Sequence, residues 1–188
     1  GTPHPFLEIG DDAVLPAGFL SAMEEGIRKG LNDLPARPMG VRGNELERIS
    51  QCQGLYDEPG MLKPAPTQIR RIAGSKIRLT ILMLGGGPEI RSKTQALFHM
   101  HSLDHVVEEM IEWAIPQVEA LGCQPCTLSF GLGRTAFEAS SLSLEAMKEG
   151  CYDVQSELEK RITDAVNSRG IGPIGLGGAS SVLATLLK

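Results

Sequence analysis

Two cysteines and two glycines stand close together in the stretch GCQPCTLSFGLGRTAFEASSL, residues 122–142. Cys123 and Cys126 form a Cys-x-Pro-Cys pair, and Gly131 and Gly133 form a Gly-x-Gly turn that begins eight residues after Cys123. Thiolates at this spacing can serve as a redox pair or as metal ligands. A glycine turn that opens a helix can bind the phosphates of a dinucleotide. The stretch is therefore compatible with a redox site, a zinc site, a dinucleotide loop, or one ligand of a larger site.

The redox and zinc interpretations both need partners that the surrounding sequence supplies poorly. A thioredoxin-type pair requires its first cysteine at a helix N-terminus, where the helix dipole lowers the thiol pKa. Here a predicted helix precedes the pair and a predicted strand follows it. A zinc site requires further ligands, which Cys151 and the histidines of HMHSLDH could supply. Those histidines, His99, His101 and His105, are also typical of the solvated start of a helix.

The glycine turn allows two interpretations. The stretch FGLGRTAF, residues 130–137, matches Gly-x-Gly-x-x-Ala between a predicted strand and a predicted helix. A second helix rather than a strand follows, however, and a single match of this kind has low specificity. A tight turn that joins a strand to a helix would use the same glycines. Both interpretations stay open on this evidence of spacing alone.

Apolar periodicity predicts the elements of the first half of the chain. Residues 5–10, PFLEIG, alternate in the manner of a strand. Residues 18–34 place apolar side chains about four positions apart, which predicts an amphipathic helix. Residues 67–84 predict two strands across a Gly-Ser turn, or one broken strand. Between the helix and these strands, residues 35–66 are rich in Pro, Gly and polar residues and show no sustained period. This is typical of a loop that is functional or partly ordered by a partner.

The second half of the chain predicts helices around one short strand. Residues 102–122 predict a helix with Ser102 as its N-cap and a kink at Pro116. CTLSF, which begins at Cys126, predicts a buried strand, and two helices follow it, over residues 134–150 and 154–170. The chain ends in an apolar segment, SSVLATLLK. The loose alternation of strands and helices predicts an α/β (or α+β) fold with one main sheet and flanking helices.

Composition narrows the class of protein. A chain of 188 residues and 20.2 kDa predicts a single domain over residues 1–188. The net charge of -5 and the lack of a Lys/Arg run argue against nucleic acid as a partner. The apolar runs are too short for a membrane helix, and four cysteines are too few for a secreted disulfide scaffold, so we expect a cytoplasmic protein with reduced thiols. The chain begins without methionine, which suggests a piece of a longer protein.

Three stretches in their order carry a resemblance to a known family. They are GGGPEIRSKTQAL, then GCQPCTLSFGLGRTAFEAS, then LEKRITDAVNSRGIGPIGLGGASSVLATLL. Together they resemble the α part of the iron–sulfur hydro-lyases, which are class I fumarate hydratase and the L-tartrate dehydratase α subunit. In that family a triple-glycine loop, a Cys-Pro-Pro, a Gly-x-Gly-x-Gly-Gly-Thr turn and a Gly-Ile-Gly-Pro-x-Gly-x-Gly-Gly loop follow one another. The opening Gly-Thr fits the end of a further family motif, so the resemblance spans nearly the whole chain.

The resemblance implies roles for individual residues. Cys123 corresponds to one of three thiolate ligands of a [4Fe-4S] cluster, and Cys126 is then its neighbour. Arg37, in LPARPMGV, stands where a substrate-binding arginine is expected. The other residues implied at the site are Gly85, Gly86 and Gly87 for substrate binding, and Gly131, Gly133, Thr135, Gly175, Gly177 and Gly178 in loops near it.

The implied activity is the reversible dehydration of a 2-hydroxy dicarboxylate, such as malate to fumarate, or of tartrate. Three cysteines leave one iron of the cluster open as a Lewis acid for the substrate hydroxyl. An arginine holds a substrate carboxylate in two parallel hydrogen bonds. A base removes the proton from the adjacent carbon, but no residue of this sequence is assigned as that base. The implied partners are a β subunit or C-terminal β domain and further copies of the chain in a homo-oligomer.

The sequence also departs from the family pattern. The first and third cluster cysteines are expected beyond the two ends of the chain, while Cys52 and Cys151 lie outside the ligand motifs. Leu84 and Ala179 replace lysines of the family loops. We therefore expect the isolated chain to be inactive. The alternative is a non-catalytic or nucleotide-binding α/β domain that keeps the scaffold.

Overall fold

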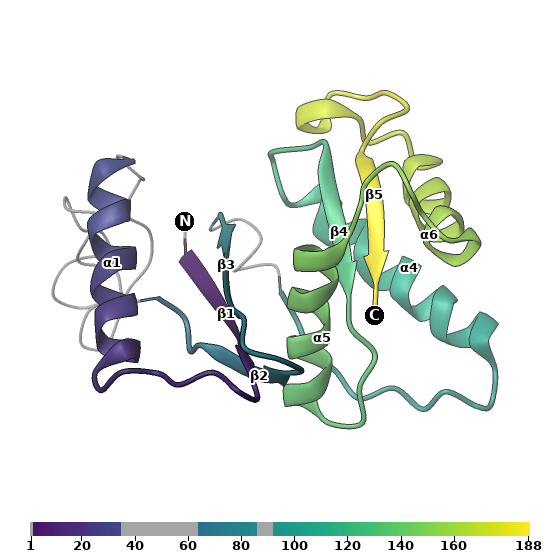
Figure 1. Ribbon diagram of the computed structural model, residues 1–188. Helices are drawn as coiled ribbons and strands as arrows, with labels where there is room; N and C mark the ends of the chain where they lie inside the picture. Colours follow the sequence, from purple (N-terminus) through teal and green to yellow (C-terminus); the bar gives the residue numbers. More distant parts are fainter. Residues whose placement is uncertain (1, 35–63, 86–91) are drawn as a thin grey trace, which may run out of the picture. The chain divides into compact units, whose positions relative to one another are not determined.

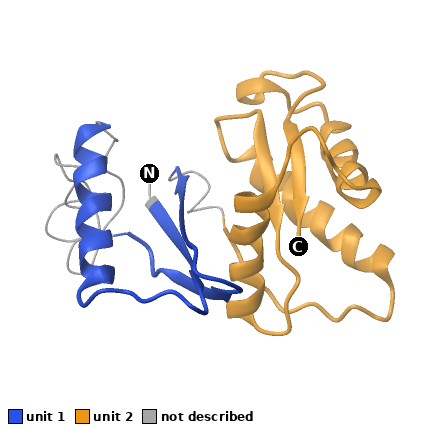
Figure 2. Ribbon diagram, viewed as in Figure 1, with its two compact units in different colours: residues 1–90 blue, residues 91–188 orange. Residues whose placement is uncertain are grey.

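The structure is a computed structural model that describes residues 2–34, 64–85 and 92–188. Its contacts divide the chain into two compact units, residues 1–90 and residues 91–188 (Figure 2). Both helices and strands are present, which confirms the mixed α/β class. In the described residues the strands form two small sheets, where the sequence predicted one main sheet. The single domain over residues 1–188 stays a prediction.

The first unit is a three-stranded sheet with one described helix (Figure 1). The strands are β1 (Thr2–Gly10), β2 (Gln68–Ile72) and β3 (Ile77–Leu84), and the helix is α1 (Phe19–Asp33). The order is β2-β1-β3, with β1 parallel to β2 and antiparallel to β3. The two predicted strands on either side of the Gly-Ser turn are therefore confirmed, but β1 lies between them.

The core of the first unit joins α1 to β1. Met23, Ile27 and Leu31 lie on one face of α1 because their spacing of four residues nearly matches the helical repeat. They pack against Leu7 and Ile9 of β1, and all five side chains are buried. The amphipathic helix predicted over residues 18–34 is confirmed.

The second unit places helices on both faces of a two-stranded parallel sheet (Figure 1). The strands are β4 (Cys126–Phe130) and β5 (Val182–Leu187). Helices α4 (Leu103–Glu119) and α6 (Glu157–Asn167) cover one face, and α5 (Ala136–Glu149) covers the other. The short 3₁₀ turn η2 (Pro173–Gly175) precedes β5.

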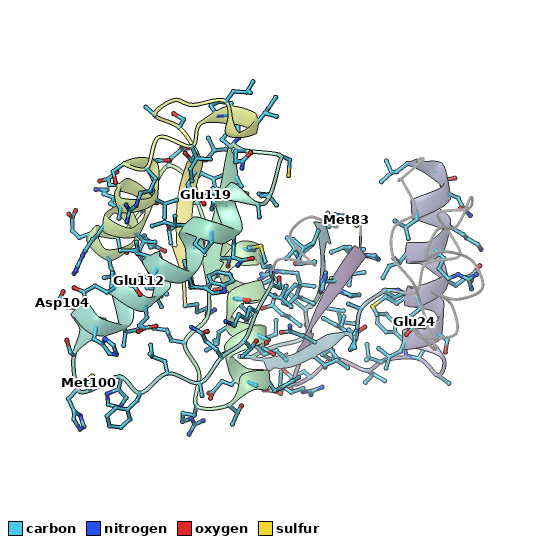
Figure 3. All side chains as sticks on the ribbon, turned by 180° about the vertical axis from the view of Figure 1, so that it is seen from behind. Glu24, Met83, Met100, Asp104, Glu112 and Glu119 are labelled. Atoms are coloured by element: carbon cyan, nitrogen blue, oxygen red, sulfur yellow. The ribbon has the colours of Figure 1, made fainter. Side chains whose placement is uncertain are left out.

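The helix predicted over residues 102–122 is confirmed together with its cap. The hydroxyl of Ser102 accepts a hydrogen bond from the backbone N–H of His105 at 3.2 Å, which satisfies one of the free amides at the start of α4. The buried face of α4 contributes Val107, Met110, Ala114 and Val118 to a core shared with β4, α6 and β5. Asp104, Glu112 and Glu119, labelled in Figure 3, belong to the exposed residues of the same helix.

Side chains close the outer edge of β5. The backbone N–H of Thr185 donates to Gln155 Oε1 at 3.0 Å, and that of Leu187 donates to Glu159 Oε1 at 2.9 Å. The other carboxylate oxygen of Glu159 accepts from the backbone N–H of Ser156 at 2.7 Å, in a capping box at the start of α6. Carboxylate and amide oxygens thus take the place of a neighbouring strand, which leaves this edge closed to further pairing.

The Glu159 contacts predict an acid-sensitive contribution to stability. Burial raises the pKa of this carboxyl, which is the largest single effect. Hydrogen bonds from Ser156 and Leu187 together lower the pKa by more than burial raises it, so the net pKa lies below its ordinary value of 4.5. A lowered folded-state pKa contributes stability above pH 4.5, and this contribution is lost as the pH falls through the folded-state pKa. As the pH falls from about 5 to about 3, the melting temperature of the unmodified chain should therefore decrease more steeply than that of the Glu159→Gln variant. Parallel pH profiles of the two proteins would contradict this role.

Candidate functional site

Cys123 lies in the loop that joins α4 to β4. After α4 ends at Glu119, Gly122 adopts a left-handed φ of 73°, which turns the chain away from the helix axis. Cys123 follows with an exposed side chain, and β4 begins three residues later at Cys126. A helix therefore precedes the cysteine pair and a strand follows it, as predicted. This order lacks the helix N-terminus on which a thioredoxin-type redox pair depends.

Gln124 fixes this loop to its surroundings. Its side chain is 4% exposed, and its amide Nε2 donates to the backbone carbonyl of Val118 in α4. The backbone carbonyl of Gln124 accepts from the backbone N–H of Ile174 at 3.2 Å, and a cis peptide bond joins Gln124 to Pro125. The backbone on the C-terminal side of Cys123 is thus held by both a helix and a second loop.

Cys126 is chemically distinct from Cys123. Its side chain is half-buried, and its Sγ lies 3.7 Å from the carbonyl oxygen of Ser181, to which it donates. Burial, and secondarily the nearby Cys123, raise the pKa of the Cys126 thiol to about 11, against a small opposing effect of a backbone hydrogen bond. The thiol is therefore protonated at neutral pH and is a poor nucleophile. This favours the prediction that Cys126 is a neighbour and not a partner of Cys123.

The second loop, residues 170–178, is closed by its own backbone. The N–H of Gly177 donates to the carbonyl of Ile171 at 2.8 Å, and the N–H of Gly178 donates to that of Gly170 at 3.2 Å. Gly172 has a φ of 70°, and a Cβ there would lie 2.1 Å from backbone atoms of Gly177. Glycine is thus required both for the backbone conformation and for the close approach of the two sides of the loop.

Parallel pairing brings the two loops to the same end of the sheet. Cys126 at the start of β4 pairs with Val182 at the start of β5, so the loops that precede these strands are neighbours. The hydrogen bond from Ile174 to Gln124 joins them directly. The structure therefore places the 170–178 loop, with the predicted residues Gly175, Gly177 and Gly178, beside the Cys123 loop.

The turn at residues 131–135 lies at the opposite end of β4. Leu132 donates from its backbone N–H to the carbonyl of Lys188, which follows the last residue of β5. Five strand residues separate the two ends, which corresponds to roughly 15 Å at the usual rise per residue. The structure does not bring Gly131, Gly133 and Thr135 together with Cys123.

The glycines of this turn accommodate helix α5. A Cβ at Gly131 would lie 2.1 Å from the carbonyl oxygen of Ala139, and one at Gly133 would lie 2.5 Å from the Ala139 nitrogen. Thr135 is the N-cap of α5, because its hydroxyl accepts from the N–H of Glu138 at 3.1 Å. These contacts give the glycines a packing role and favour the tight-turn interpretation.

Glu138 further disfavours a dinucleotide here. Its carboxylate accepts from the backbone N–H of Arg134 at 2.8 Å and pairs with the Arg134 guanidinium at 3.3 Å. The hydrogen bond from the Arg134 side chain contributes most, and together these contacts hold the Glu138 pKa below its ordinary value. The negatively charged Glu138 carboxylate therefore already accepts the hydrogen bond from the Arg134 amide, which a pyrophosphate at this turn would need. A shallow cavity of about 560 Å³ lies over the same surface and is lined by Arg134, Thr135, Phe137, Glu138, Ser141, Leu142 and Glu145.

His99 and His101 lie just before α4, and His105 lies in its first turn. His99 and His101 are exposed, and their rings meet edge-on with centroids 4.9 Å apart. His99 Nδ1 accepts from the backbone N–H of His101 at 2.9 Å. Across residues 2–34, 64–85 and 92–188, no group of three or more His, Cys, Asp or Glu side chains could hold a metal ion. The described residues thus give no support to a zinc site built from these histidines and Cys151.

The remaining predicted residues fall outside the described part of the chain or in the first unit. Arg37, Gly86, Gly87 and Cys52 fall outside the described residues. Gly85, which follows β3, is exposed and belongs to the first unit, whereas Cys123 belongs to the second.

The sequence did not single out two residues that support the Cys123 loop. Ser181 and Gln124 are both buried and make the contacts that join the two loops. Ser181 carried no signal of its own, because a serine before an apolar strand is common. Gln124 could have been suspected from its place between Cys123 and Pro125.

One exposed thiol on a supported loop fits one ligand of a metal cluster. Cys123 is exposed, its neighbour Cys126 is half-buried, and the backbone that follows Cys123 is held by hydrogen bonds. A complete ligand set is not found among the described side chains.

Comparison with known proteins identifies the family. The family model described as fumarate hydratase (Fumerase) matches residues 1–188, which is the whole chain. The chain belongs to this family. A relative in Methanocaldococcus jannaschii, provisionally named L(+)-tartrate dehydratase subunit alpha, is 26% identical over 195 residues. This match covers 100% of the chain and 66% of the relative.

Relatives in Escherichia coli are similar over a shorter stretch. The L(+)-tartrate dehydratase subunit alpha of strain O157:H7 is 28% identical over 120 residues, which cover 61% of the chain and 39% of that protein. The protein of the same name in strain K12 is 28% identical over 115 residues, or 58% and 38% of the two lengths. The chain therefore spans less than two thirds of the length of these fumarate hydratase family relatives. No helix among the described residues has both the length and the apolar character to cross a bilayer.

Proposed function

We propose that the chain is the α-type part of an iron–sulfur hydro-lyase that reversibly dehydrates a 2-hydroxy dicarboxylate such as malate or tartrate. Membership of the fumarate hydratase family supports the reaction class, and the names of the relatives suggest tartrate or a similar diacid. The observation that carries the proposal is an exposed Cys123, held on a loop that parallel strands place beside the 170–178 glycine loop.

Cys123 would serve as one thiolate ligand of a [4Fe-4S] cluster. When bound, such a cluster supplies a Lewis acid for the substrate hydroxyl. The Cys123 side chain is exposed in the loop that follows the Gly122 turn. Cys126 is half-buried and its thiol donates to the Ser181 carbonyl, so we do not assign it as a second ligand. The chain thus contributes one anchoring thiolate, and the other two belong to the complete protein.

Substrate binding is proposed for the residues that the resemblance implies. Arg37 is proposed to hold one carboxylate of the diacid in a bidentate contact. Gly85, Gly86 and Gly87 would let the backbone approach the substrate closely. We further propose a β subunit or C-terminal β domain as partner, since the relatives are named as alpha subunits, together with a homo-oligomer in the cytoplasm.

Iron content of the complete protein tests this function. The full-length polypeptide, purified without oxygen together with its β partner, should contain iron and sulfide and interconvert malate and fumarate or dehydrate tartrate. Absence of both iron and turnover would favour the alternative, a non-catalytic or nucleotide-binding domain that keeps the scaffold.

The isolated chain should behave differently. A cluster that normally needs three protein thiolates is not anchored by Cys123 alone. The 188-residue chain, reconstituted with iron and sulfide under anaerobic conditions and desalted, should therefore keep far less than one cluster per chain and show no turnover. Stoichiometric iron and sulfide after desalting would refute the assignment of the missing ligands to the rest of the protein.

A further inference from the structure

The Cys123 loop, the 170–178 loop and helix α6 meet at one buried serine. Ser181 is 0% exposed, and each of its polar groups contacts a different element. Its hydroxyl accepts from the backbone N–H of Gly172 at 2.9 Å, and its carbonyl accepts from the backbone N–H of Cys126 at 3.1 Å. Its own N–H donates to Asn167 Oδ1 at 2.8 Å. Ser181 therefore joins α6 to both loops.

Asn167 completes this connection from the last residue of α6. Its Oδ1 accepts a second hydrogen bond, from the backbone N–H of Val182 at 2.8 Å. Its Nδ2 donates to the carbonyl of the same residue at 3.0 Å. One carboxamide thus satisfies two consecutive amides and one carbonyl at the start of β5. A side chain without both an acceptor and a donor would leave buried backbone groups unpaired.

We propose that Asn167 and Ser181 are positioning residues for Cys123. They fix the start of β5. Through Cys126 and Gly172 they also hold the loop that contains Cys123 and the neighbouring 170–178 loop. Among the described residues, the hydrogen bonds of Ser181 run to Gly172, Cys126 and Asn167, and those of Asn167 run to Ser181 and Val182. None of them involves the Cys123 thiol, so both residues would act on Cys123 through the backbone. The inference rests on the proposed function, in which Cys123 is a cluster ligand.

The reason for such a connection lies in the exposure of Cys123. An exposed loop thiol has no packing of its own to fix its direction, and a metal ligand must be held close to its productive geometry. A fully satisfied buried network supplies that rigidity at a distance. Besides the pairing of β4 with β5, one direct hydrogen bond, from Ile174 to Gln124, joins the two loops among the residues that the structure describes.

A general role in stability is the competing explanation, and the chain offers a matched control. The hydroxyl of Thr163 donates to Thr185 at 2.9 Å in the same unit, and both residues are buried. This pair links α6 to β5, and its hydrogen bonds to described residues reach neither loop. Thr163→Val should therefore destabilise the unit to a degree similar to Ser181→Ala without loosening the loops.

The experiment follows the alkylation of Cys126 in the 188-residue chain under native conditions, by mass spectrometry. Cys126 is half-buried against Ser181, while the exposed Cys151 serves as the internal reference. Ser181→Ala and Asn167→Ala should each raise the Cys126 rate about tenfold relative to Cys151, because the loop then opens more often. Thr163→Val should leave that ratio unchanged. An equal rise in all three variants, or no rise in the first two, would overturn the proposal.

Two additions keep the outcome decisive. Asn167→Asp keeps the oxygen that accepts from two amides, so it should raise the Cys126 alkylation rate less than Asn167→Ala does. If the alanine variants do not fold, Asn167→Asp is compared with the wild-type chain instead. In the full-length protein, Ser181→Ala and Asn167→Ala should lower the iron content more than Thr163→Val does. If the wild-type protein contains no iron, the proposed function fails, whereas the alkylation result still decides whether these residues hold the loops. Iron content equal in all three variants would remove their role toward Cys123.

Discussion

Cys123→Ser in the complete protein is expected to remove most of the bound iron and to lower turnover more than about 100-fold. A serine hydroxyl is far harder to deprotonate than a thiol and is a poor ligand for an iron–sulfur cluster. Cys123 is exposed, so the substitution itself should cost little folding stability. The measurement is iron per chain after anaerobic purification, together with conversion of malate or tartrate.

Cys126→Ser is the matched control, three positions away at the start of β4. Because the Cys126 thiol is half-buried and donates to the Ser181 carbonyl, its replacement should keep most of the iron and most of the turnover. The expected cost is on the order of 1 kcal/mol of unfolding free energy, from the altered contact with the Ser181 carbonyl. Equal losses in the two variants, accompanied by a reversible disulfide, would instead restore the redox-pair interpretation.

Gly172→Ala should give the largest loss of stability among single glycine substitutions in the 170–178 loop. The new Cβ would lie 2.1 Å from the Gly177 carbonyl group and 2.5 Å from the Gly178 nitrogen, and φ is 70°. The contact atoms are backbone and cannot move aside without opening the loop. We expect a loss of more than about 3 kcal/mol in the unfolding free energy, measured by urea denaturation.

Gly175→Ala separates this steric effect from backbone strain. Gly175 has nearly the same φ, 71°, but no atom of the described residues lies within 4 Å of the position that its new methyl group would take. Its substitution should therefore cost only about 1–2 kcal/mol, the usual penalty for a left-handed alanine. Similar losses at both positions would show that the close approach of the loop backbone does not matter for stability.

Much of the local structure followed from short-range patterns in the sequence. The spacing of Met23, Ile27 and Leu31 predicted α1, and Ser102 predicted the start of α4. The strand at Cys126 and the helix before it were also predicted, which already disfavoured a redox pair. These predictions succeeded because helix periodicity and capping depend on residues that are near one another along the chain.

Sheet pairing was decided by the tertiary structure. β2 and β3 are joined by a short turn, but the end of β1 lies between them: Gly10 donates to the carbonyl of Lys76 and Asp11 to that of Ile72. The prediction of one main sheet was replaced by two, because hydrogen bonding between strands does not depend on their order in the sequence.

The site shows the same division. The sequence alone singled out Cys123 and both glycine-rich stretches as one group, since they follow one another in the family order. Only the parallel pairing of β4 with β5, which joins Cys126 to Val182 across 56 positions, separates them. It brings the 170–178 loop to Cys123 and leaves Gly131 and Gly133 at the far end of β4, where α5 packs against them. Residue types and local periods are set by the chain itself, whereas the meeting of two loops depends on which distant strands share hydrogen bonds.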